Sequence, residues 1–574
     1  MQVDKQRAQD MRAKGWWGER TVFSQFESLL AENGEREALV DAINRADFLG
    51  DAPRRMTFRQ VAEEVDRATV VLHQRGLGVG DVLCVQLPNC VEQFVVYLAC
   101  ARLGIVVSPL PIQYREHELQ YILELLQAKA LMVYSGGSEQ DAPVLRARAL
   151  VQDGFLQANA VLALGHAPSL TDHENWTALL AKVQDATAQA QMLGKAAQTT
   201  SDHVFTICWT SGTEARAKGV PHTHNEWFAQ GRVSLGLSRV GQHDRILNPF
   251  PLINMAGFAT CFFPWLMTGC TVVQHQPFKL PVYLQQLREE AISHTVAPAA
   301  ILNAMLHKPE LVQGIDFKLL SRIGSGAAPL SEWMVKEFQD RWGVSILNFY
   351  GSNEGGSLAG SELDVPDPTL RATCFPRTGV AGLQWRGDGM DSVSTRLVDP
   401  ANEEEITQPG RVGELRFSGP TVFSGYIGDP ALTQRAFDAQ GYYRSGDLFE
   451  IVGEGDAYYR YVGRLKDVII RGGMNLSAEE IDSLLLAHPA IADAAVVGFP
   501  DAALGERVCA FVVLRDGVES LSLAQLSAFL RDEKKVAVFK MPERLEVVHA
   551  LPRSAVGKIL RRDLREILNA EVAA

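Results

Sequence analysis

A run of small hydroxyl residues and glycine, closed by a lysine, follows a hydrophobic stretch of this 574-residue chain. Residues 204–209 are typical of a strand, and the mobile loop expected after them contains Lys218. The small residues of that loop are Thr210, Ser211, Gly212 and Thr213. Such a loop lets N–H groups and hydroxyl oxygens approach a phosphate, to which the lysine adds positive charge. The Gly-Lys-Ser/Thr order of a Walker loop is absent from it, and an ordinary turn remains the alternative.

Charged side chains suited to nucleotide chemistry occur further along the chain. The carboxylate of Asp447 can accept hydrogen bonds from both hydroxyls of a ribose, unless it forms a salt bridge to Arg444 or another cation. Glu354 can hold Mg²⁺ on nucleotide phosphates, because hard cations prefer oxygen ligands, or it is a solvated loop acid. Lys558 closes a Ser-x-x-Gly-Lys sequence and can stabilise the negative charge of a transition state. A solvated tail lysine is the alternative for this residue.

Six segments, in order along the chain, resemble the signatures of the adenylate-forming superfamily. This superfamily includes acyl-CoA synthetases, luciferase-like enzymes and the adenylation domains of peptide synthetases. The phosphate loop is the first segment, and the other five are residues 324–330, 348–354, 443–447, 463–467 and 551–559. The resemblance extends from about Thr21 to Arg562. Any one segment is a weak signal, but chance is a poor explanation for the ordered set.

The resemblance implies an ATP site whose parts lie far apart in the sequence. It assigns Lys558, Glu354 and Lys218 to catalysis, with Glu354 also serving as the ligand of Mg²⁺. It implies that Tyr350 stacks on adenine, with core packing as the alternative. Arg464 would reach the ribose or organise the hinge, with a surface ion pair as the alternative. The residues assigned to ATP or AMP are Thr210, Ser211, Gly212, Thr213, Gly326, Ala327, Ala328, Tyr350, Gly351, Asn353, Asp447 and Arg464.

The two half-reactions of such an enzyme need different groups around one acyl carbonyl. The resemblance implies that a C-terminal lid domain, residues 468–574, rotates about a hinge at residues 464–467 that joins it to an N-terminal body, residues 1–463. Lys466 aligns with the hinge residue, where the family carries Asp or Lys. Gly473 would face the site in the second step, where a missing side chain leaves room for the pantetheine of CoA. A tight-turn glycine is the alternative.

The chain departs from the family pattern at several positions. The phosphate loop usually reads Thr-Gly-x-Pro-Lys after its second Thr, but here Glu214, Ala215 and Ala217 replace the Thr, Gly and Pro and place an acid near phosphates. Asn254 stands where many members have a histidine, which puts the gating role of that histidine in doubt. Asn353 stands where a threonine precedes the catalytic glutamate. Both asparagines can still form hydrogen bonds.

An uncharged stretch from Ile246 to Phe278 is the candidate source of the acyl pocket. Its four prolines break the pattern of a membrane-spanning helix, so we expect strand and helix pieces of a buried core. The resemblance implies that the acyl pocket is lined by Asn254, Met255, Gly257 and Phe258. An apolar pocket without a clear cation favours a medium-chain, alicyclic or aromatic acid. The sequence is similar to cyclohexanecarboxylate-type CoA ligases.

The composition is that of an ordinary globular protein, with 47% hydrophobic and 21% charged residues. A net charge of −13 argues against general nucleic-acid binding but does not exclude small anionic ligands. The eight cysteines form no Cys-x-x-Cys pair and the N-terminus has no hydrophobic signal segment, so buried thiols in a reducing cytoplasm are expected. His222 and His224 are expected to pack or form hydrogen bonds, because the sequence identifies no further metal ligands beside them.

The elements that must position these residues are those of an α/β protein. Strand-like and helix-like segments alternate over residues 82–134, which indicates βαβ units and a parallel sheet. Residues 177–202 are expected to form a surface connection. A small β-rich subdomain is indicated after Val380 by residues 394–398, 412–417 and 449–461. The expected fold is a large multi-subdomain N-terminal body, with two βαβ sheets and the β-rich subdomain, followed by a smaller mobile α+β C-terminal domain.

The leading hypothesis is an ATP-dependent carboxylic acid–CoA ligase of fatty-acid metabolism that forms an acyl-adenylate and then a thioester. Its expected cofactors are ATP, Mg²⁺ and CoA, its partner is a small carboxylic acid, and a homodimer is left open. No nucleic acid and no integral membrane segment are expected. Two alternatives remain: an acid–AMP ligase that loads a separate carrier protein, and a non-catalytic adenylate-binding protein.

Overall fold

The computed structural model divides into two compact units. The first contains the described residues of Met1–Thr210, Ala217–Ser394 and Ser418–Tyr443, and the second contains those of Thr395–Phe417 and Arg444–Ala574. The structure describes residues 4–572 except for 137–142, 158, 167–169, 211–216, 327–329, 472–473, 502–503, 535, 537 and 555–556. Each unit is described by itself.

The first sheet of the first unit confirms the βαβ pattern expected from residues 82–134. Its strands pair in parallel except at one edge, where β8 runs antiparallel to β7. In order across the sheet, the strands are β6 (Val161–Leu164), β5 (Ala130–Tyr134), β3 (Val82–Gln86), β4 (Val106–Pro109), β7 (Val204–Thr210) and β8 (Lys218–Thr223). The helices between consecutive strands of this sheet include α5 (Val91–Leu103), α6 (Glu116–Leu126) and α7 (Pro143–Gln152).

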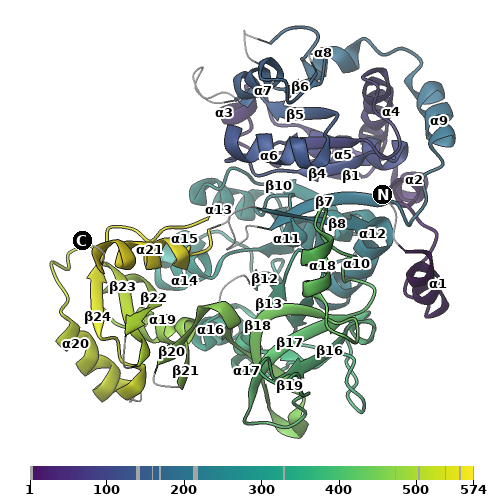
Figure 1. The fold of residues 1–574 in the computed structure, drawn as a ribbon. Helices are drawn as coiled ribbons and strands as arrows, with labels where there is room; N and C mark the ends of the chain where they lie inside the picture. The colour runs from purple at the N-terminus through teal and green to yellow at the C-terminus, as the bar shows by residue number, and fades with distance from the viewer. Residues whose placement is uncertain are drawn as a thin grey trace. The chain divides into compact units, whose positions relative to one another are not determined.

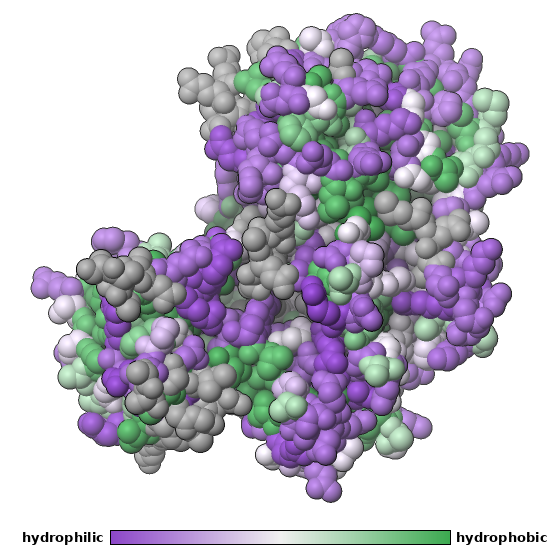
Figure 2. All heavy atoms as spheres, viewed as in Figure 1, coloured by the Kyte–Doolittle hydropathy of each residue, from purple (hydrophilic) through white to green (hydrophobic). Residues whose placement is uncertain are grey.

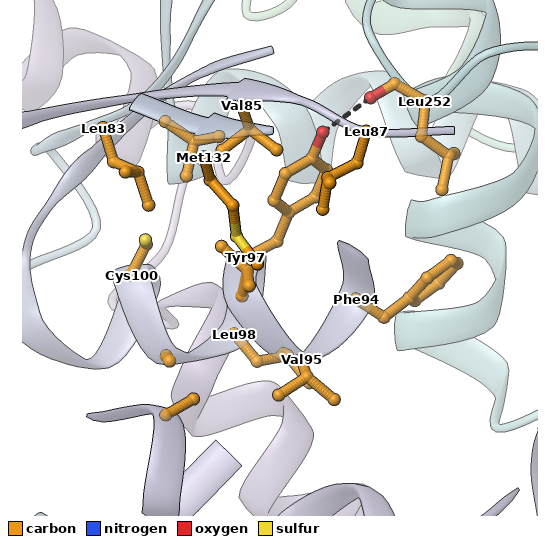
Figure 3. Packing of buried hydrophobic residues seen from close by; sticks show 14 of the residues in the cluster. Leu83, Val85, Leu87, Phe94, Val95, Tyr97, Leu98, Cys100, Met132 and Leu252 are labelled. Carbon is orange, nitrogen blue, oxygen red and sulfur yellow. Dashed lines mark hydrogen bonds between the residues drawn. The ribbon is translucent and has the colours of Figure 1, made fainter. Parts of the chain in front are cut away.

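Helix α5 is buried along its whole length, and its mostly apolar sequence also contains the buried polar residues Glu92, Gln93 and Arg102. Figure 3 shows Tyr97 of this helix among side chains of the neighbouring strands, including Leu83 and Met132. The Tyr97 hydroxyl donates a hydrogen bond of 2.8 Å to the carbonyl of Leu252, so the one polar atom of the ring is satisfied inside the core.

A second, larger sheet completes the two βαβ sheets expected from the sequence. Strands β1, β10, β9, β11, β12 and β13 pair in parallel, and β14 and β2 add antiparallel edges. In order across the sheet, the strands are β14 (Ser357–Gly360), β13 (Ser345–Gly351), β12 (Arg322–Gly326), β11 (His294–Val296), β9 (Arg245–Asn248), β10 (Thr271–Gln274), β1 (Glu37–Val40) and β2 (Arg55–Thr57). Helices along this part of the chain include α13 (Leu280–Glu289), α14 (Ala299–His307) and α16 (Glu332–Trp342).

The uncharged stretch from Ile246 to Phe278 is divided among short elements of the core, as expected. It contains most of β9, the turn-like helix α11 (Met255–Gly257), a π-helical turn (Phe258–Phe262), α12 (Phe263–Thr268) and β10. Phe26, Phe58 and Phe94 pack around Trp265 of α12 at ring-centroid distances of 5.0–5.9 Å. No helix in the described part of the chain has the length and hydrophobicity needed to cross a membrane.

Residues 177–202 are more regular than the surface connection expected from the sequence. They contain most of α8 (Trp176–Ala181) and all of α9 (Ala186–Ala197), which lies beside α4 (Phe58–Gln74) in Figure 1. The alanine and glutamine content that suggested a connection also has high helix propensity. Packing against α4 then stabilises α9, although Ala190 is its one buried residue.

The second unit contains the predicted β-rich strands and a C-terminal α+β region. Strands β16 (Ser394–Val398), β17 (Val412–Ser418), β18 (Tyr443–Val452) and β19 (Tyr458–Arg464) lie in one sheet. The β18–β19 pair is an antiparallel hairpin, as its sequence predicted. The C-terminal sheet contains β20 (Val468–Arg471), β21 (Met474–Ser477), β22 (Ile491–Asp501), β23 (Gly505–Leu514) and β24 (Arg544–Val547). Its helices are α19 (Ala478–Leu486), α20 (Leu523–Ala528) and α21 (Arg561–Val572).

The eight cysteines are free thiols and all are buried, as expected. Burial raises the pKa of the Cys84 and Cys208 thiols to about 12, so these groups are neutral and unreactive at physiological pH. Figure 2 shows that hydrophilic residues cover most of the described surface on the face in view. The polar surface and apolar interior are those of an ordinary globular protein.

Buried histidines are expected to make the stability of the first unit depend on pH. His224 stacks on Phe205 and accepts a hydrogen bond of 3.1 Å from the backbone N–H of Val22 at Nδ1. Burial lowers the pKa of His224 from 6.5 to about 3. The unfolded chain therefore binds one more proton in this window, so the free energy of unfolding falls as the pH is lowered from 6.5 towards 3.

Replacing His224 by Asn, whose amide oxygen can also accept the Val22 N–H, is expected to reduce this pH dependence. The reduction should approach one proton, or about 1.4 kcal/mol per pH unit. Urea unfolding at a series of pH values below 6.5 measures it, with the exposed His73→Asn as the control. An unchanged slope in His224→Asn would contradict the neutral buried state.

Candidate functional site

The loop of small hydroxyl residues joins two paired strands of the first unit. β7 ends at Thr210 and β8 begins at Lys218, and these two residues face each other in the antiparallel pair. Lys218, predicted to lie on a mobile loop, instead belongs to the strand that follows the loop, because it pairs with Thr210. Ser211, Gly212 and Thr213, together with the altered positions Glu214 and Ala215, lie outside the described residues.

Gly326 and Tyr350 lie at the carboxyl ends of two neighbouring parallel strands, where α/β sheets commonly bind ligands. Gly326 pairs with Phe349, and a Cβ on Gly326 would lie only 2.2 Å from the Phe349 carbonyl oxygen. The position therefore requires glycine. Tyr350 is half-buried, with its ring 6.0 Å from that of Phe375. Ala327 and Ala328 lie outside the described residues.

Asn353 ties together three segments that are distant in sequence. Its Nδ2 donates a hydrogen bond of 2.9 Å to the carbonyl of Trp209, and its Oδ1 accepts one of 2.9 Å from the N–H of Met255. The Asn353 carbonyl lies 2.5 Å from Nε2 of His222. A carbonyl oxygen can only accept, so His222 carries a proton on Nε2 and donates it. Asn353, which stands where the family pattern has a threonine, therefore anchors the turn that leads to Glu354.

The Glu354 side chain is held by residues more than sixty positions later in the chain. The Tyr426 hydroxyl donates a hydrogen bond of 2.8 Å to Glu354 Oε1, and the backbone N–H of Phe423 donates one of 2.9 Å to the Glu354 carbonyl. Gly355, at φ +91°, approaches the carbonyl of Thr421 so closely that a Cβ on it would lie 1.8 Å away. Only 7% of Glu354 is exposed, so the alternative of a solvated loop acid is wrong.

Tyr426 also connects Glu354 to Lys218. The Lys218 Nζ lies 5.5 Å from the centroid of the Tyr426 ring, within the range of a cation–π contact. The N–H of Ile427 donates a hydrogen bond of 3.0 Å to the carbonyl of Gly219, which fixes this loop to β8. Sequence reasoning missed Tyr426, because it lies 72 residues after Glu354 and no spacing links the two. The glycine directly before Tyr426 was too weak a signal to indicate a functional residue there.

The two histidines after the loop are packed and hydrogen-bonded, as expected. His222 donates to Asn353 and lies 4.9 Å from the Trp227 ring, while His224 accepts from Val22. No cluster of three or more His, Cys, Asp or Glu side chains suited to a metal ion occurs among the residues that the structure describes.

The residues predicted to line the acyl pocket lie in one segment, in which Met255, Gly257 and Phe258 are buried and Asn254 is half-buried. The Asn254 side chain caps α11 by accepting from the N–H of Gly257 at 3.3 Å. A Cβ on Gly257 would lie 2.3 Å from the carbonyl oxygen of Pro251, so the segment folds only with glycine there. Phe258 packs between Tyr97 and Trp227, with ring centroids 5.6 and 4.8 Å away. Met255 is buried as well. The role of this segment in binding an acid stays a prediction.

In the second unit, the structure brings Asp447 and Arg464 together. They face each other across the β18–β19 hairpin, and Arg464 Nε lies 3.4 Å from Asp447 Oδ1. Burial works against the charge of Arg464, but nearby acidic groups, Asp447 foremost, hold its pKa above the usual value. Arg444, named above as a salt-bridge partner for Asp447, instead pairs with Glu403 at 2.9 Å. The alternative of a salt bridge between Asp447 and a cation other than Arg444 is therefore met, with Arg464 as that cation.

The predicted hinge forms a short 3₁₀ turn (Leu465–Asp467) between β19 and β20. Lys466 is exposed, whereas Asp467 is buried and forms an ion pair of 3.3 Å with Arg565 of α21. A Cβ on Gly463 would lie 2.9 Å from Oγ of Ser477, the residue that caps α19. The turn is thus packed closely against the C-terminal region on both sides of Lys466. Gly473 lies outside the described residues.

Lys558 lies at the end of a tight loop that its own backbone closes. The N–H of Ser554 donates 2.7 Å to the Lys558 carbonyl, and the N–H of Lys558 donates 3.2 Å to Ser554 Oγ. Gly557 has φ +83°, a conformation that favours glycine. Arg553 donates to the Gly557 carbonyl at 2.7 Å and pairs with Asp493 at 2.6 Å. The serine and glycine of the Ser-x-x-Gly-Lys sequence therefore shape the loop that presents this exposed lysine.

Two stretches of the chain match models of known protein families. Residues 26–427 match the family model described as AMP-binding enzyme, and residues 480–558 match that of the AMP-binding enzyme C-terminal domain. The medium-chain fatty-acid–CoA ligase of Escherichia coli (strain K12) is 31% identical over 99% of this chain and 95% of its own. The 2-hydroxy-7-methoxy-5-methyl-1-naphthoate–CoA ligase of Streptomyces carzinostaticus is 30% identical over 91% of this chain and 90% of its own. ATP-bound MatB from Rhodopseudomonas palustris is 25% identical, with a TM-score of 0.76 over 96% of this chain and 99% of its own.

Replacing Asn353 by Ala is expected to destabilise the first unit, because the Trp209 carbonyl and the Met255 N–H each lose a partner. A loss of about 1–3 kcal/mol in the free energy of unfolding is expected. Urea unfolding measures it, with the exposed Asn159→Ala as the matched control. Equal stability of the two variants would show that Asn353 does not hold the turn together.

Proposed function

This chain belongs to the AMP-binding enzyme family, and on that premise we propose that it is an ATP-dependent carboxylic acid–CoA ligase that catalyses two successive reactions. In the first, the acid and ATP form an acyl-adenylate and pyrophosphate. In the second, CoA displaces AMP to give an acyl-CoA thioester. The similarity to an acid–CoA ligase over 99% of the chain is the observation that carries the proposal.

The first reaction joins two negatively charged molecules. A carboxylate oxygen of the acid attacks the α-phosphorus of ATP, and the bond from that phosphorus to the bridging oxygen breaks. Pyrophosphate leaves with the electron pair. Lys558 stabilises the charge that accumulates on the α-phosphate and the acid, because an ammonium placed there interacts more strongly with the transition state than with the ground state. Lys218 acts on the departing pyrophosphate and contributes less.

The donor set around Glu354 fits a magnesium ion that arrives with ATP. Glu354 offers a carboxylate that Tyr426 orients through Oε1, and Mg²⁺ is commonly held by one or two carboxylates, phosphate oxygens and waters. Bound with ATP, Mg²⁺ neutralises phosphate charge. Lys218 lies over the ring of Tyr426 and supplies a second positive charge. Together they would orient the phosphates for attack.

The nucleoside is assigned to residues that lie far apart in the sequence. Asp447 accepts hydrogen bonds from the ribose hydroxyls with its two oxygens, and Arg464 keeps this carboxylate in place. Tyr350 stacks on adenine beside the strand end at Gly326. Thr210 and the loop after it accommodate the phosphates. These assignments are supported by the positions of the residues at strand ends and in the β18–β19 hairpin.

In the second reaction, the CoA sulfur attacks the acyl carbon of the adenylate. The bond from this carbon to the phosphate oxygen breaks, AMP leaves with the electron pair, and the thiol proton passes to solvent. We assign Lys466 as the hinge residue of a domain rotation between the two reactions, with residues 1–463 and 468–574 as the two domains. The short 3₁₀ turn at Lys466 supports this assignment. Gly473 would leave room for the pantetheine arm.

The acid is proposed to be medium-chain, alicyclic or aromatic. The supporting observation is the uncharged stretch from Ile246 to Phe278, whose Met255 and Phe258 are buried among aromatic side chains. The two similar ligases act on a medium-chain fatty acid and on a naphthoate, as their names state. We further propose a role in fatty-acid metabolism in the cytoplasm, where buried free thiols persist, and a homodimer remains a prediction.

A screen of carboxylic acids tests this function directly. The purified protein is incubated with ATP, Mg²⁺, CoA and each acid, and pyrophosphate, AMP and thioester are quantified. We expect acid-dependent release of pyrophosphate and formation of free acyl-CoA with apolar acids. Pyrophosphate without acyl-CoA, with transfer of the acyl group to an added carrier protein, would identify a carrier-loading ligase. No reaction with any acid, despite binding of ATP, would favour a non-catalytic adenylate-binding protein.

Replacing Lys558 by Ala is expected to lower the rate of acid-dependent pyrophosphate release by about 10²- to 10³-fold, the effect of removing one preorganised stabiliser of transition-state charge. Hydrolysis or thiolysis of acyl-adenylate supplied from outside should be affected much less, because the charge on the α-phosphate has already been relieved. Lys534→Ala, another exposed lysine of the second unit, is the matched control. Pyrophosphate release that survives Lys558→Ala would contradict the assigned role.

A further inference from the structure

The segment before the AMP-binding match contributes side chains to the surroundings of Glu354. The match begins at residue 26, whereas helix α1 (Lys5–Ala13) lies entirely before it. Arg7 of this helix donates hydrogen bonds to the carbonyls of Val422 and Phe423, the latter at 3.2 Å, and to Ser424 Oγ at 3.3 Å. One guanidinium therefore contacts three consecutive residues of the loop that leads to Tyr426.

That loop holds Glu354 from one side. The N–H of Phe423, the residue whose carbonyl Arg7 binds, donates to the Glu354 carbonyl at 2.9 Å. Three residues later, the Tyr426 hydroxyl donates to Glu354 Oε1 at 2.8 Å. A displacement of the loop backbone would therefore move both hydrogen bonds to Glu354. Arg7 is the side chain that binds this backbone from the N-terminal helix.

Arg7 is also connected to the turn at Asn353 and Glu354 through the buried carboxylate of Glu226. Its Nη2 lies 3.5 Å from Oε1 of Glu226, whose side chain is only 1% exposed. The other oxygen of Glu226 lies 3.7 Å from Nδ1 of His222 and accepts from the N–H of Thr223 at 2.8 Å. His222 in turn donates to the carbonyl of Asn353, directly before Glu354. Burial alone would raise the pKa of Glu226, but His222 and Arg7 hold it below its usual value.

Further contacts fix the helix that carries Arg7. The Arg7 guanidinium lies 5.4 Å from the centroid of the Trp17 ring, and Trp17 Nε1 donates to the carbonyl of Pro420 at 3.1 Å. On the next turns of α1, Arg12 pairs with Asp202 at 3.0 Å. Arg12 therefore anchors the same helix, but its partners are Glu19, Ser201 and Asp202, and not the loop at Phe423 or Glu226. The helix therefore carries two arginines, Arg7 and Arg12, that contact different residues.

We propose that Arg7 is a positioning residue for Glu354, acting through the Val422–Phe423 backbone on one side and through Glu226, His222 and Asn353 on the other. A single guanidinium can do this because its donors form a rigid fork that binds carbonyls and a carboxylate at once. The N-terminal helix is then a working part of the metal–nucleotide site. This inference rests on the proposed function in one respect, the role of Glu354 as the carboxylate that holds Mg²⁺ with ATP.

The test compares Arg7→Gln with Arg12→Gln in the full-length protein. Arg7 and Arg12 are similarly exposed, at 22% and 26% of their side chains, and both form ion pairs within the first unit, Arg7 with Glu226 and Arg12 with Glu19 and Asp202. We expect Arg7→Gln to raise the Mg²⁺ concentration needed for half-maximal pyrophosphate release, and the Kd for MgATP in calorimetry, by about threefold to tenfold. Arg12→Gln should leave both unchanged, and neither variant should change the KM for CoA.

A double variant, Arg7→Gln with Glu226→Gln, guards against a simple failure to fold. It removes both charges, so no buried carboxylate is left without its cation. We expect it to unfold at nearly the wild-type urea concentration and to keep the raised Mg²⁺ requirement. A wild-type Mg²⁺ requirement in the folded double variant, or an equal shift in Arg12→Gln, would overturn the inference and leave Arg7 with a merely structural role.

Hydrogen exchange separates this inference from the proposed function. Without nucleotide, Arg7→Gln is expected to speed exchange of the Phe423 amide, which donates to Glu354, and Arg12→Gln is not. An unchanged Phe423 amide would overturn the link between Arg7 and Glu354 whatever the enzyme does. A protein that shows the exchange effect but neither binds MgATP nor releases pyrophosphate would instead contradict the proposed function.

Discussion

The first unit is organised around the hydrogen-bonding needs of the turn at Asn353 and Glu354. A buried carboxylate and the backbone around it must find hydrogen-bond partners, and here the partners come from segments that are far apart in sequence. Trp209 and His222 lie at the two strands beside the phosphate loop, Met255 begins the candidate acyl segment, and Tyr426 lies in a loop that reaches back to β8. The hydrogen bonds of this one turn therefore hold together β7, β8, the start of α11 and the loop at Tyr426.

In the second unit, local ion pairs and backbone hydrogen bonds instead hold single charged groups in place. Asp447 is paired with Arg464 across a hairpin, and Lys558 projects from a loop closed by Ser554 and braced by Arg553. These are rigid local structures around side chains that would act on a bound ligand. The net charge of −13 is no obstacle to an anionic substrate, because such local cations decide what binds.

Sequence reasoning succeeded where a short segment contains both the functional residue and the reason for its conformation. The Ser-x-x-Gly-Lys loop is such a case, since Ser554 and Gly557 shape the backbone that presents Lys558. The strands at residues 82–134 and the β18–β19 hairpin were likewise predicted from periodicity and turn residues. Helix α9 was missed because its amphipathic pattern is weak and its packing partner, α4, lies more than a hundred residues earlier.

By itself, the sequence determined the family, the α/β class, and the identity of Glu354, Asp447 and Lys558 as candidates, because each lies in a segment with a recognisable order of residues. Only the tertiary structure decided that Arg464, and not Arg444, pairs with Asp447, and that Tyr426 and Arg7 belong with Glu354. Those contacts join residues from tens to hundreds of positions apart. No local pattern encodes them, since they follow from how the buried strands and helices pack.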